Sequence, residues 1–439
     1  MVERNSHKGF SREAVELLSH LKDEPSWMRD LRLRAWRFFE EIPMPTGKEE
    51  LWRRTRLTGF RWDAFAPFPV NGNQPASGED TPPALQKFLD TMTGAGALIT
   101  QDMDVRWCEL DAELATKGVL FTDLDTAIKE YPDLVQRYFM NEGVAVDASK
   151  FAALHAAFWT AGTFLYVPRN VVVEQPLHAL IYLARPATAG FYHTVVVTEP
   201  GAVVTYAEEY LGGEAGMQSS VVELFAGPGS QIRYLHLQNL ATSTWNFSTQ
   251  RGILRRDANL TWITASLGSR LSKVDIQLDL VEPGTRGDLL GLYFPTGTQH
   301  IDHHTLQNHI ASNASSDLLF KGALKDRARS VYQGSIRVWP GAQKTDAYQA
   351  NKNLILNKGA RADSIPGLEI EADDVRCTHS ATVSQIPEDY VFYLMARGLS
   401  RVQAEHTIVQ GFFEELLDRV QVDAVRLRLE QAISDRLRL

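Results

Sequence analysis

The tetrapeptide Glu199-Pro-Gly201-Ala predicts a turn between two apolar segments, and a similar turn, Gly227-Pro-Gly229-Ser, follows 28 residues later. Related turn markers continue along the chain at steps of 28, 27, 29 and 28 residues, at Asp257, Gly284, Asn313 and Gly341. Turn residues that return at a nearly constant spacing indicate a solenoid, in which each repeat forms one coil stacked on the last.

The segments between these turns have the composition of β-strands. β-branched residues dominate in them, for example in Phe164-Leu-Tyr-Val, Val171-Val-Val, Leu180-Ile-Tyr-Leu, His193-Thr-Val-Val-Val and Ile276-Gln-Leu-Asp-Leu-Val. Each interval is too short for a strand–helix–strand unit of roughly 30 or more residues. A parallel β-helix therefore fits best. An antiparallel sandwich stays open, because turns alone do not determine strand direction.

Helical patterns lie on both sides of the β-rich region. An apolar stripe from Trp27 to Phe39 predicts an early helix, and helical periodicity returns in 123–140 and 152–160. The segment 67–83 is rich in Pro, Gly, Asn and Ser and predicts a loop. Pro387 and Ser400 can begin two later helices, and 422–439 is a last amphipathic segment. We expect a mainly helical domain at 1–160, a β-helix core at 161–384 and a helical domain at 385–439.

The composition argues against several classes of protein. The 439 residues are 44% hydrophobic and 23% charged, as in ordinary globular proteins. The net charge of −9 and the pI near 5.8 argue against a partner such as nucleic acid or an anionic membrane. Two cysteines cannot build a disulfide framework and the N-terminus has no apolar signal segment, so we expect a cytoplasmic protein. No apolar run reaches the roughly 18 residues that a membrane span needs.

Two groups of residues could ligate a metal. Cys377 and His379 are two positions apart, so on a strand they would face the same side and could bind one atom. Thiolate and imidazole together suit zinc or iron, although two ligands do not complete a site. In the second group, His300, Asp302 and His304 would share one face of a strand. The alternative to a metal site there is a ladder of polar side chains. This second group consists of His300, Asp302, His304 and His309.

The most specific motifs lie between about residue 299 and residue 415. They include Phe320-Lys-Gly322, Pro340-Gly-Ala-Gln-x-Thr345-Asp-Ala, Asn351-x-Asn-Leu354 and Ala372-Asp-Asp-Val-x-Cys377-x-His379-x-Ala-Thr382. With these spacings the chain resembles the SufD family of iron–sulfur cluster assembly proteins, paralogues of SufB. The β-rich region before Cys377 lacks the additional cysteines of SufB-type chains, which favours SufD. Ser380 departs from the family, where SufD usually has glycine.

The resemblance implies a right-handed parallel β-helix between two helical domains. It implies a non-catalytic scaffold that pairs with SufB through the β-helix and docks the SufC ATPase with its C-terminal helices. It also implies that His379 and Cys377 lie at the junction with SufB and hold iron or a transient iron–sulfur cluster, with reduced flavin as a further cofactor of the complex. The residues expected to contact a partner are Phe392, Arg397, Phe412 and Phe413.

Two other functions stay open at this point. One is a purely structural homodimer in which Cys377 and His379 are simply packed side chains; the isolated chain could adopt this state. The other is a carbohydrate-active β-helix enzyme that uses Asp373 and Asp374 as its carboxylates. Adjacent residues in a strand point to opposite faces, so this pair is a poor acid–base couple. The scaffold therefore remains the preferred interpretation.

Overall fold

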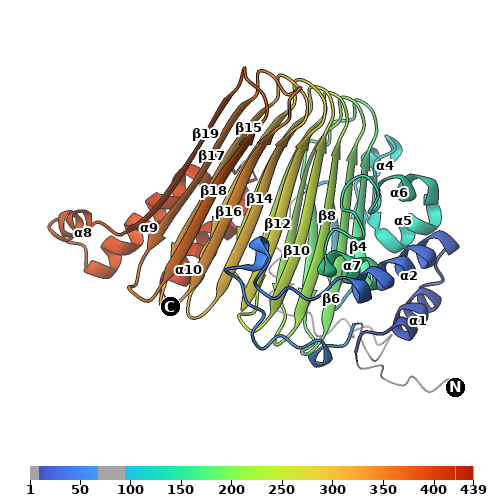
Figure 1. The fold of residues 1–439 in the computed structure, drawn as a ribbon, viewed down its shortest axis with the longest axis horizontal. Helices are drawn as coiled ribbons and strands as arrows, with labels where there is room; N and C mark the ends of the chain where they lie inside the picture. The colour runs from blue at the N-terminus through green and yellow to red at the C-terminus, as the bar shows by residue number, and fades with distance from the viewer. Residues whose placement is uncertain (1–8, 68–93, 421, 439) are drawn as a thin grey trace.

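A computed structural model describes residues 9–67, 94–420 and 422–438, and it confirms the solenoid (Figure 1). From β4 onward the chain alternates between two sheets, so each coil contributes one strand to each of them. The ten-stranded sheet contains β1 (Gly96–Gln101), β2 (Asp104–Leu110), β5 (Leu177–Leu183), β7 (Val203–Gly212), β9 (Gln231–Leu240), β11 (Asn259–Ser266), β13 (Arg286–Tyr293), β15 (Ser315–Leu324), β17 (Asp346–Ile355) and β19 (Arg376–Gln385). The nine-stranded sheet contains β3 (Leu120–Asp123), β4 (Ala161–Val167), β6 (Ala189–Thr198), β8 (Met217–Ala226), β10 (Trp245–Leu254), β12 (Leu271–Leu280), β14 (His300–His309), β16 (Arg329–Val338) and β18 (Arg361–Ile370).

Strand direction decides between the two architectures that the sequence left open. Neighbouring strands are parallel throughout the repeated part of both sheets, for example β10 with β12 and β15 with β17. Among the described strands, only β1 with β2 and β3 with β4 pair in the antiparallel direction. The parallel solenoid is therefore confirmed, and the antiparallel sandwich is wrong.

Five of the six turn markers have a left-handed backbone conformation, and the N–H groups of four of them donate to carbonyls of the next coil. Gly201 and Gly229 have φ values of 72° and 64°. Their N–H groups donate to the carbonyls of Pro228 and Arg256, at 2.9 and 2.7 Å. Gly, Asp and Asn adopt the left-handed conformation at a lower energetic cost than other residues, which explains why the turn series consists of them. The sixth marker differs, because in the longer turn 339–345 it is Lys344 (φ 60°), not Gly341, that donates to the next coil.

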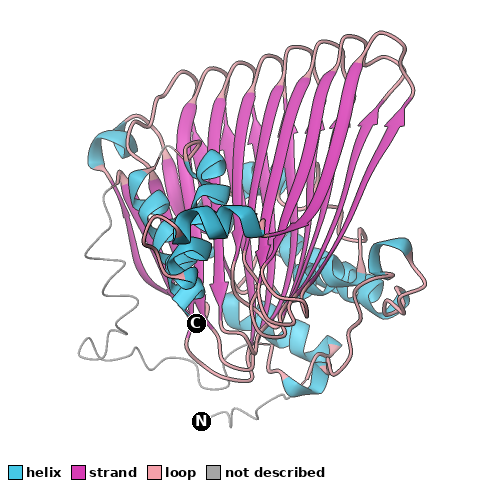
Figure 2. Ribbon diagram, turned by 90° about the vertical axis from the view of Figure 1, so that its left-hand side faces the viewer, coloured by secondary structure: helices cyan, strands magenta, loops and turns pink. Residues whose placement is uncertain are grey.

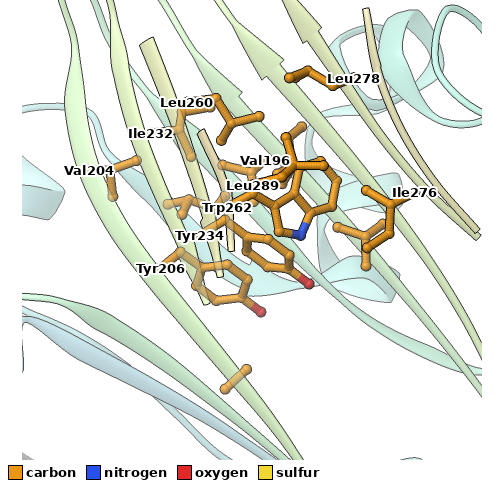
Figure 3. Packing of buried hydrophobic residues seen from close by; sticks show 14 of the residues in the cluster. Val196, Val204, Tyr206, Ile232, Tyr234, Leu260, Trp262, Ile276, Leu278 and Leu289 are labelled. Atoms are coloured by element: carbon orange, nitrogen blue, oxygen red, sulfur yellow. The ribbon is translucent and has the colours of Figure 1, made fainter. Parts of the chain in front are cut away.

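Side chains from the two sheets meet inside the solenoid and form its largest apolar cluster (Figure 3). Tyr206, Tyr234 and Trp262 occupy equivalent positions in successive coils. The two tyrosine rings stack with centroids 6.0 Å apart, and Trp262 meets Tyr234 edge-on at 5.3 Å. Offset-stacked and edge-on pairs each add about 0.5–1.5 kcal/mol beyond the burial of their surface. The aromatic residues thus join one coil to the next.

Helices cover the outer faces of both sheets (Figures 1 and 2). The N-terminal helices pack on the first strands of the nine-stranded sheet, and the C-terminal helices pack on the ten-stranded sheet. None of the described helices is both long and apolar enough to cross a membrane. The helices are α1 (Arg12–Lys22), α2 (Ser26–Glu41), α4 (Ala112–Thr116), α5 (Leu124–Glu130), α6 (Pro132–Tyr138), α7 (Lys150–Phe158), α8 (Glu388–Met395), α9 (Arg401–Leu417) and α10 (Asp423–Arg438).

The segment 96–123 differs from the mainly helical character expected of the N-terminal region. It contributes β1, β2 and β3, and β1 joins the ten-stranded sheet parallel to β5. Leu98 and Ile99 are buried there. Short apolar runs do not reveal whether they form strand or helix, so periodicity missed these strands. The loop predicted at 67–83 lies, apart from Pro67, outside the described residues.

Candidate functional site at the open end of the solenoid

Among the described residues, no element caps the last coil of the solenoid, which is formed by β18 and β19. Each of the two strands is the edge strand of its sheet, and nearly all of their residues are at least partly exposed. Leu368, Ile370 and Val383 are 39%, 41% and 49% exposed. The residues paired with them on the preceding strands β16 and β17 are buried, namely Ile336, Val338 and Asn353. Unpaired strand edges beside exposed apolar side chains form a template for another chain. We call β18 and β19 the open end.

Cys377 lies on β19 with its side chain half-buried. It packs against a small apolar cluster that includes Ile336, Val338 and Ala347. Burial, and then the negative charge of Asp346, raise the pKa of this thiol above its ordinary value. A neutral thiol is therefore favoured in the isolated chain, and a metal or a positive group would have to compensate for ionisation.

His379 follows on the same strand, is exposed, and pairs in register with Gln349 of β17. Because it is two positions from Cys377, the two side chains share the face that continues the interior of the solenoid. In the described part of the chain, no group of three or more His, Cys, Asp or Glu side chains could hold a metal ion. A metal at Cys377 and His379 would therefore need ligands from another chain.

Asp302, in the second candidate group, is compensated by protein side chains. His304 Nε2 lies 3.0 Å from Asp302 Oδ1, and Lys273 Nζ lies 3.2 Å from Oδ2. The Thr55 hydroxyl contacts both Asp302 and His300, the latter at 2.9 Å. Burial alone would raise the pKa of Asp302, but Lys273, His304 and Thr55 outweigh it and lower the pKa. The ammonium group of Lys273 thus supplies the positive charge that a metal would bring.

His309, the fourth member of this group, points into the solenoid instead. Its Nε2 lies 2.8 Å from the hydroxyl of Ser316, and burial lowers its pKa to about 4. His303 also points inward and lies 2.9 Å from the hydroxyl of Ser266. The structure therefore groups His300, Asp302 and His304 on the outer face and separates them from His309.

The four residues expected to contact a partner fall into two groups. Phe413 has no exposed surface and packs against Phe294, with ring centroids 6.1 Å apart. Phe412 is partly buried, and its carbonyl accepts a hydrogen bond from Lys321. Phe413 therefore anchors α9 on the ten-stranded sheet in this chain, and its expected contact with a partner stays a prediction.

The other two residues lie on the projecting tip of the C-terminal region (Figure 1). Phe392 is 75% exposed on α8, and Arg397 stacks on Tyr393 with 4.7 Å between guanidinium and ring. Four further large apolar side chains are exposed on this tip, namely those of Tyr390, Tyr393, Met395 and Val402. We call these residues the α8 surface. Exposed apolar side chains gathered in this way mark an interaction surface.

A buried network that the sequence did not reveal joins the N-terminal region to the solenoid. Glu223 of β8 accepts hydrogen bonds from the backbone N–H groups of Met140 and Val144, at 2.9 and 2.8 Å. Its carboxyl group also lies 2.9 Å from His193 Nε2, and His193 contacts His155 at 3.2 Å. Burial raises the pKa of Glu223 to about 8 and lowers that of His193 to about 3. This network is a candidate determinant of pH-dependent stability.

A second buried carboxyl group lies inside the solenoid. Glu208 accepts hydrogen bonds from Thr194, Tyr206 and Tyr210, at 2.7, 3.2 and 3.2 Å, and also from Tyr234. Burial raises its pKa, and these donors partly offset the effect. The only signal in the sequence was the alternation Tyr206-x-Glu208-x-Tyr210, which places the three side chains on one face of a strand.

Comparison with known protein families agrees with this architecture. Residues 181–412 match the family described as SUF system FeS cluster assembly, SufBD core domain, and residues 10–179 match the SufBD protein N-terminal region. The chain is similar to the iron–sulfur cluster assembly protein SufD of Bacillus subtilis, with 31% identity over 97% of this chain and 98% of that protein. It is also 31% identical to an iron–sulfur cluster assembly SufBD family protein of Staphylococcus epidermidis, over 93% of this chain and 89% of that protein. The chain therefore belongs to the SufBD family of iron–sulfur cluster assembly proteins and resembles SufD within it.

Proposed function

We propose that this chain is a scaffold subunit that pairs with a SufB-type chain through its open end. The observation that supports this most strongly is the uncapped last coil. The outer edges of β18 and β19 have no partner strand among the described residues, and Leu368, Ile370 and Val383 remain exposed. A second solenoid could pair with these edges and cover the exposed apolar side chains.

In this proposal the junction with the SufB-type chain is where iron or a nascent iron–sulfur cluster is held. His379 is exposed and can bind iron through a neutral imidazole nitrogen. Cys377 stands beside it as an auxiliary thiol, whose raised pKa favours the protonated form until a metal binds. The partner chain would supply the remaining ligands, since two protein ligands do not complete a site.

The α8 surface would dock a SufC-type ATPase, which would hydrolyse ATP for the complex. Phe392 is the most exposed of its large apolar side chains, and the ring of Tyr393 supports Arg397. α9 holds this tip on the ten-stranded sheet through the buried side chains of Val409 and Phe413. A movement of the ATPase could thereby reach the strands next to the open end. The complex would work in the cytoplasm and could also bind reduced flavin.

The test is bound iron and acid-labile sulfide in the complex formed by anaerobic co-expression with SufB-type and SufC-type partners. The His379→Ala complex would be compared with wild type at equal subunit stoichiometry, with the remote, exposed His20→Ala as the matched control. We expect His379→Ala to lose iron and sulfide while the complex stays intact and His20→Ala stays loaded. Unchanged loading of the His379→Ala complex would contradict a role for His379 in metal binding.

A second candidate function is a homodimer that closes the same open end without a metal. The packing of Cys377 in an apolar cluster and its raised pKa favour this alternative, because both suit a structural thiol. Failure of the chain to join a SufB-type partner, together with a stable dimer of its own, would support it. Reduced flavin would be sought in both assemblies by absorbance after anaerobic purification.

A further inference from the structure

A cavity of about 520 Å³ opens on the outer face of the nine-stranded sheet. Its walls come from the N-terminal segment 53–58 and from the starts of strands β12, β14, β16 and β18. Its volume lies within the range of about 300–1,000 Å³ that small-molecule sites occupy. Six arginines line it, which are Arg53, Arg54, Arg56, Arg270, Arg329 and Arg361.

The positive charge of this cavity is only partly compensated. Asp363 is the one acidic side chain among the described residues that line it, and it pairs with Arg361 at 2.9 Å. No carboxylate in the described part of the chain forms an ion pair with Arg56, Arg270 or Arg329. The guanidinium of Arg270 lies over the ring of Trp245, 5.0 Å from its centroid, which does not neutralise its charge. Three guanidinium groups without an ion pair at one cavity are unusual in a chain whose net charge is −9.

The register of the sheet places these charges side by side. Arg329 pairs directly with Arg361 on the next strand and with His300 on the previous one. Arg270 immediately precedes Leu271, which pairs with His300. Neighbouring strands lie about 4.8 Å apart, so like charges at these positions repel one another. A bound anion would remove this repulsion, and one that extends across several strands would remove most of it.

The N-terminal side of the cavity is held in place before any ligand arrives. Thr55 is buried, and its hydroxyl contacts His300 and Asp302. Its neighbours Arg54 and Arg56 are thereby placed at the cavity. Positioning before binding lowers the entropic cost of ordering long side chains around a ligand. Arginine also binds phosphate with two parallel hydrogen bonds, which lysine cannot do.

We propose that this cavity binds a small molecule that carries at least two linked phosphate groups. The charges extend across three strands and the N-terminal segment, which suits an extended polyanion better than a single phosphate. A concave site of this volume suits a small molecule better than a nucleic acid, which needs a long basic surface. Two of the lining residues, Arg361 and Asp363, lie on β18 of the open end, but the proposal does not require pairing with a SufB-type chain.

The test is isothermal titration calorimetry of the full chain with inorganic pyrophosphate at low ionic strength, compared with orthophosphate and ADP. We expect saturable binding of one pyrophosphate per chain and much weaker binding of orthophosphate. Binding of ADP at the same stoichiometry would support a nucleotide as the source of the phosphates, and exclusion of ADP would support an inorganic one. The double variant Arg270→Ala, Arg329→Ala should bind pyrophosphate at least about tenfold more weakly, because each loses charge-assisted hydrogen bonds.

The matched control is Arg286→Ala. Arg286 begins β13 and pairs with Asp288 at 3.1 Å, which is the same arrangement that Arg361 and Asp363 have on β18. Arg286 does not line the cavity. This variant should bind pyrophosphate like the wild type. Arg270 and Arg329 are exposed, so the double variant should unfold at the same temperature as the wild type without ligand, or higher. Equal affinities for pyrophosphate and orthophosphate, unchanged binding by the double variant, or no saturable binding by the wild type would each overturn the proposal.

Discussion

His379 lies opposite Gln349 in the parallel pairing of β19 with β17, so an exposed imidazole is one strand away from a fully buried amide. Neither the oxygen nor the nitrogen of the Gln349 side chain has a hydrogen-bond partner among the described residues. The packed interior therefore ends at β17, and the neighbouring strand β19 already belongs to the open end. A partner chain at this end would bury His379 as the β19 strand buries Gln349.

Replacement of Gln349 by leucine should stabilise the protein by about 1 kcal/mol, because it removes a buried amide without partners. The matched control is Asn351→Leu, since the amide of Asn351 donates to the hydroxyl of Tyr293 at 2.9 Å. That variant should lose about 1–3 kcal/mol because its polar partners would be left unsatisfied. Urea unfolding measures both changes. A loss of stability in Gln349→Leu would mean that Gln349 has a partner, such as an ordered water.

A negative charge at the open end should block assembly without unfolding the chain. Leu368→Glu places a carboxylate where a partner would bury an apolar side chain, while the residue is already 39% exposed in the isolated chain. We expect a stability change within about 0.5 kcal/mol and loss of co-purification with a SufB-type chain. Leu427→Glu, at a 63% exposed position on α10, should leave assembly unchanged. Assembly of Leu368→Glu at the wild-type level would place the interface elsewhere.

Two phenylalanines of the C-terminal helices should respond in opposite ways. Phe413→Ala should cost about 3 kcal/mol or more, because it leaves a cavity between α9 and the ten-stranded sheet. Phe392→Ala should leave the free energy of unfolding within about 0.5 kcal/mol of wild type, because the side chain is 75% exposed. Phe392→Ala should instead weaken binding of a SufC-type ATPase in a pull-down at equal protein concentration. Full binding by this variant would remove the α8 surface from the proposed contact.

Glu223 should make stability fall as the pH rises. Its pKa is raised from 4.5 to about 8, so the folded state holds the proton more tightly than the unfolded state does. The contribution of this proton to the free energy of unfolding is fully present below pH 4.5 and is lost as the pH rises to 8. Between pH 6.5 and 8 the loss approaches about 1 kcal/mol per pH unit. The buried histidines oppose this effect near pH 6.5, because an unfolded histidine still binds a proton there while burial lowers the pKa of His193 to about 3, and their opposition fades toward pH 8.

The check is urea unfolding of wild type and Glu223→Gln at pH 6.5, 7.2 and 8. The free energy of unfolding of the wild type minus that of the variant should fall as the pH rises, since glutamine does not titrate and the histidines contribute equally to both. Glu174→Gln, at an exposed position, should keep the wild-type slope. Equal slopes in wild type and Glu223→Gln would mean that Glu223 is ionised in the folded protein throughout this range.

The sequence was most informative where one residue's own preference decides the local structure. Pro387 precedes α8, and Ser400 caps α9 with Gln403 in a reciprocal pair of hydrogen bonds, as their positions predicted. The alternation of side chains along a strand predicted that Cys377 and His379 share one face, and both lie on β19 two positions apart. The turn series predicted stacked coils for the same reason, because Gly, Asp and Asn accept the left-handed conformation that each turn requires.

Tertiary structure alone decided which of these residues are buried, paired or free. Lys273 from the preceding coil lowers the pKa of Asp302, and burial beneath the N-terminal region raises the pKa of Glu223, so both shifts depend on distant segments of the chain. Phe413 is buried while its neighbour Phe412 is only partly covered, because α9 turns only one face to the sheet. Turn preference and strand period are properties of neighbouring residues, so the sequence determined the coil. Burial and charge depend on contacts between distant segments, so only the folded chain determined that the solenoid ends open at Cys377 and His379.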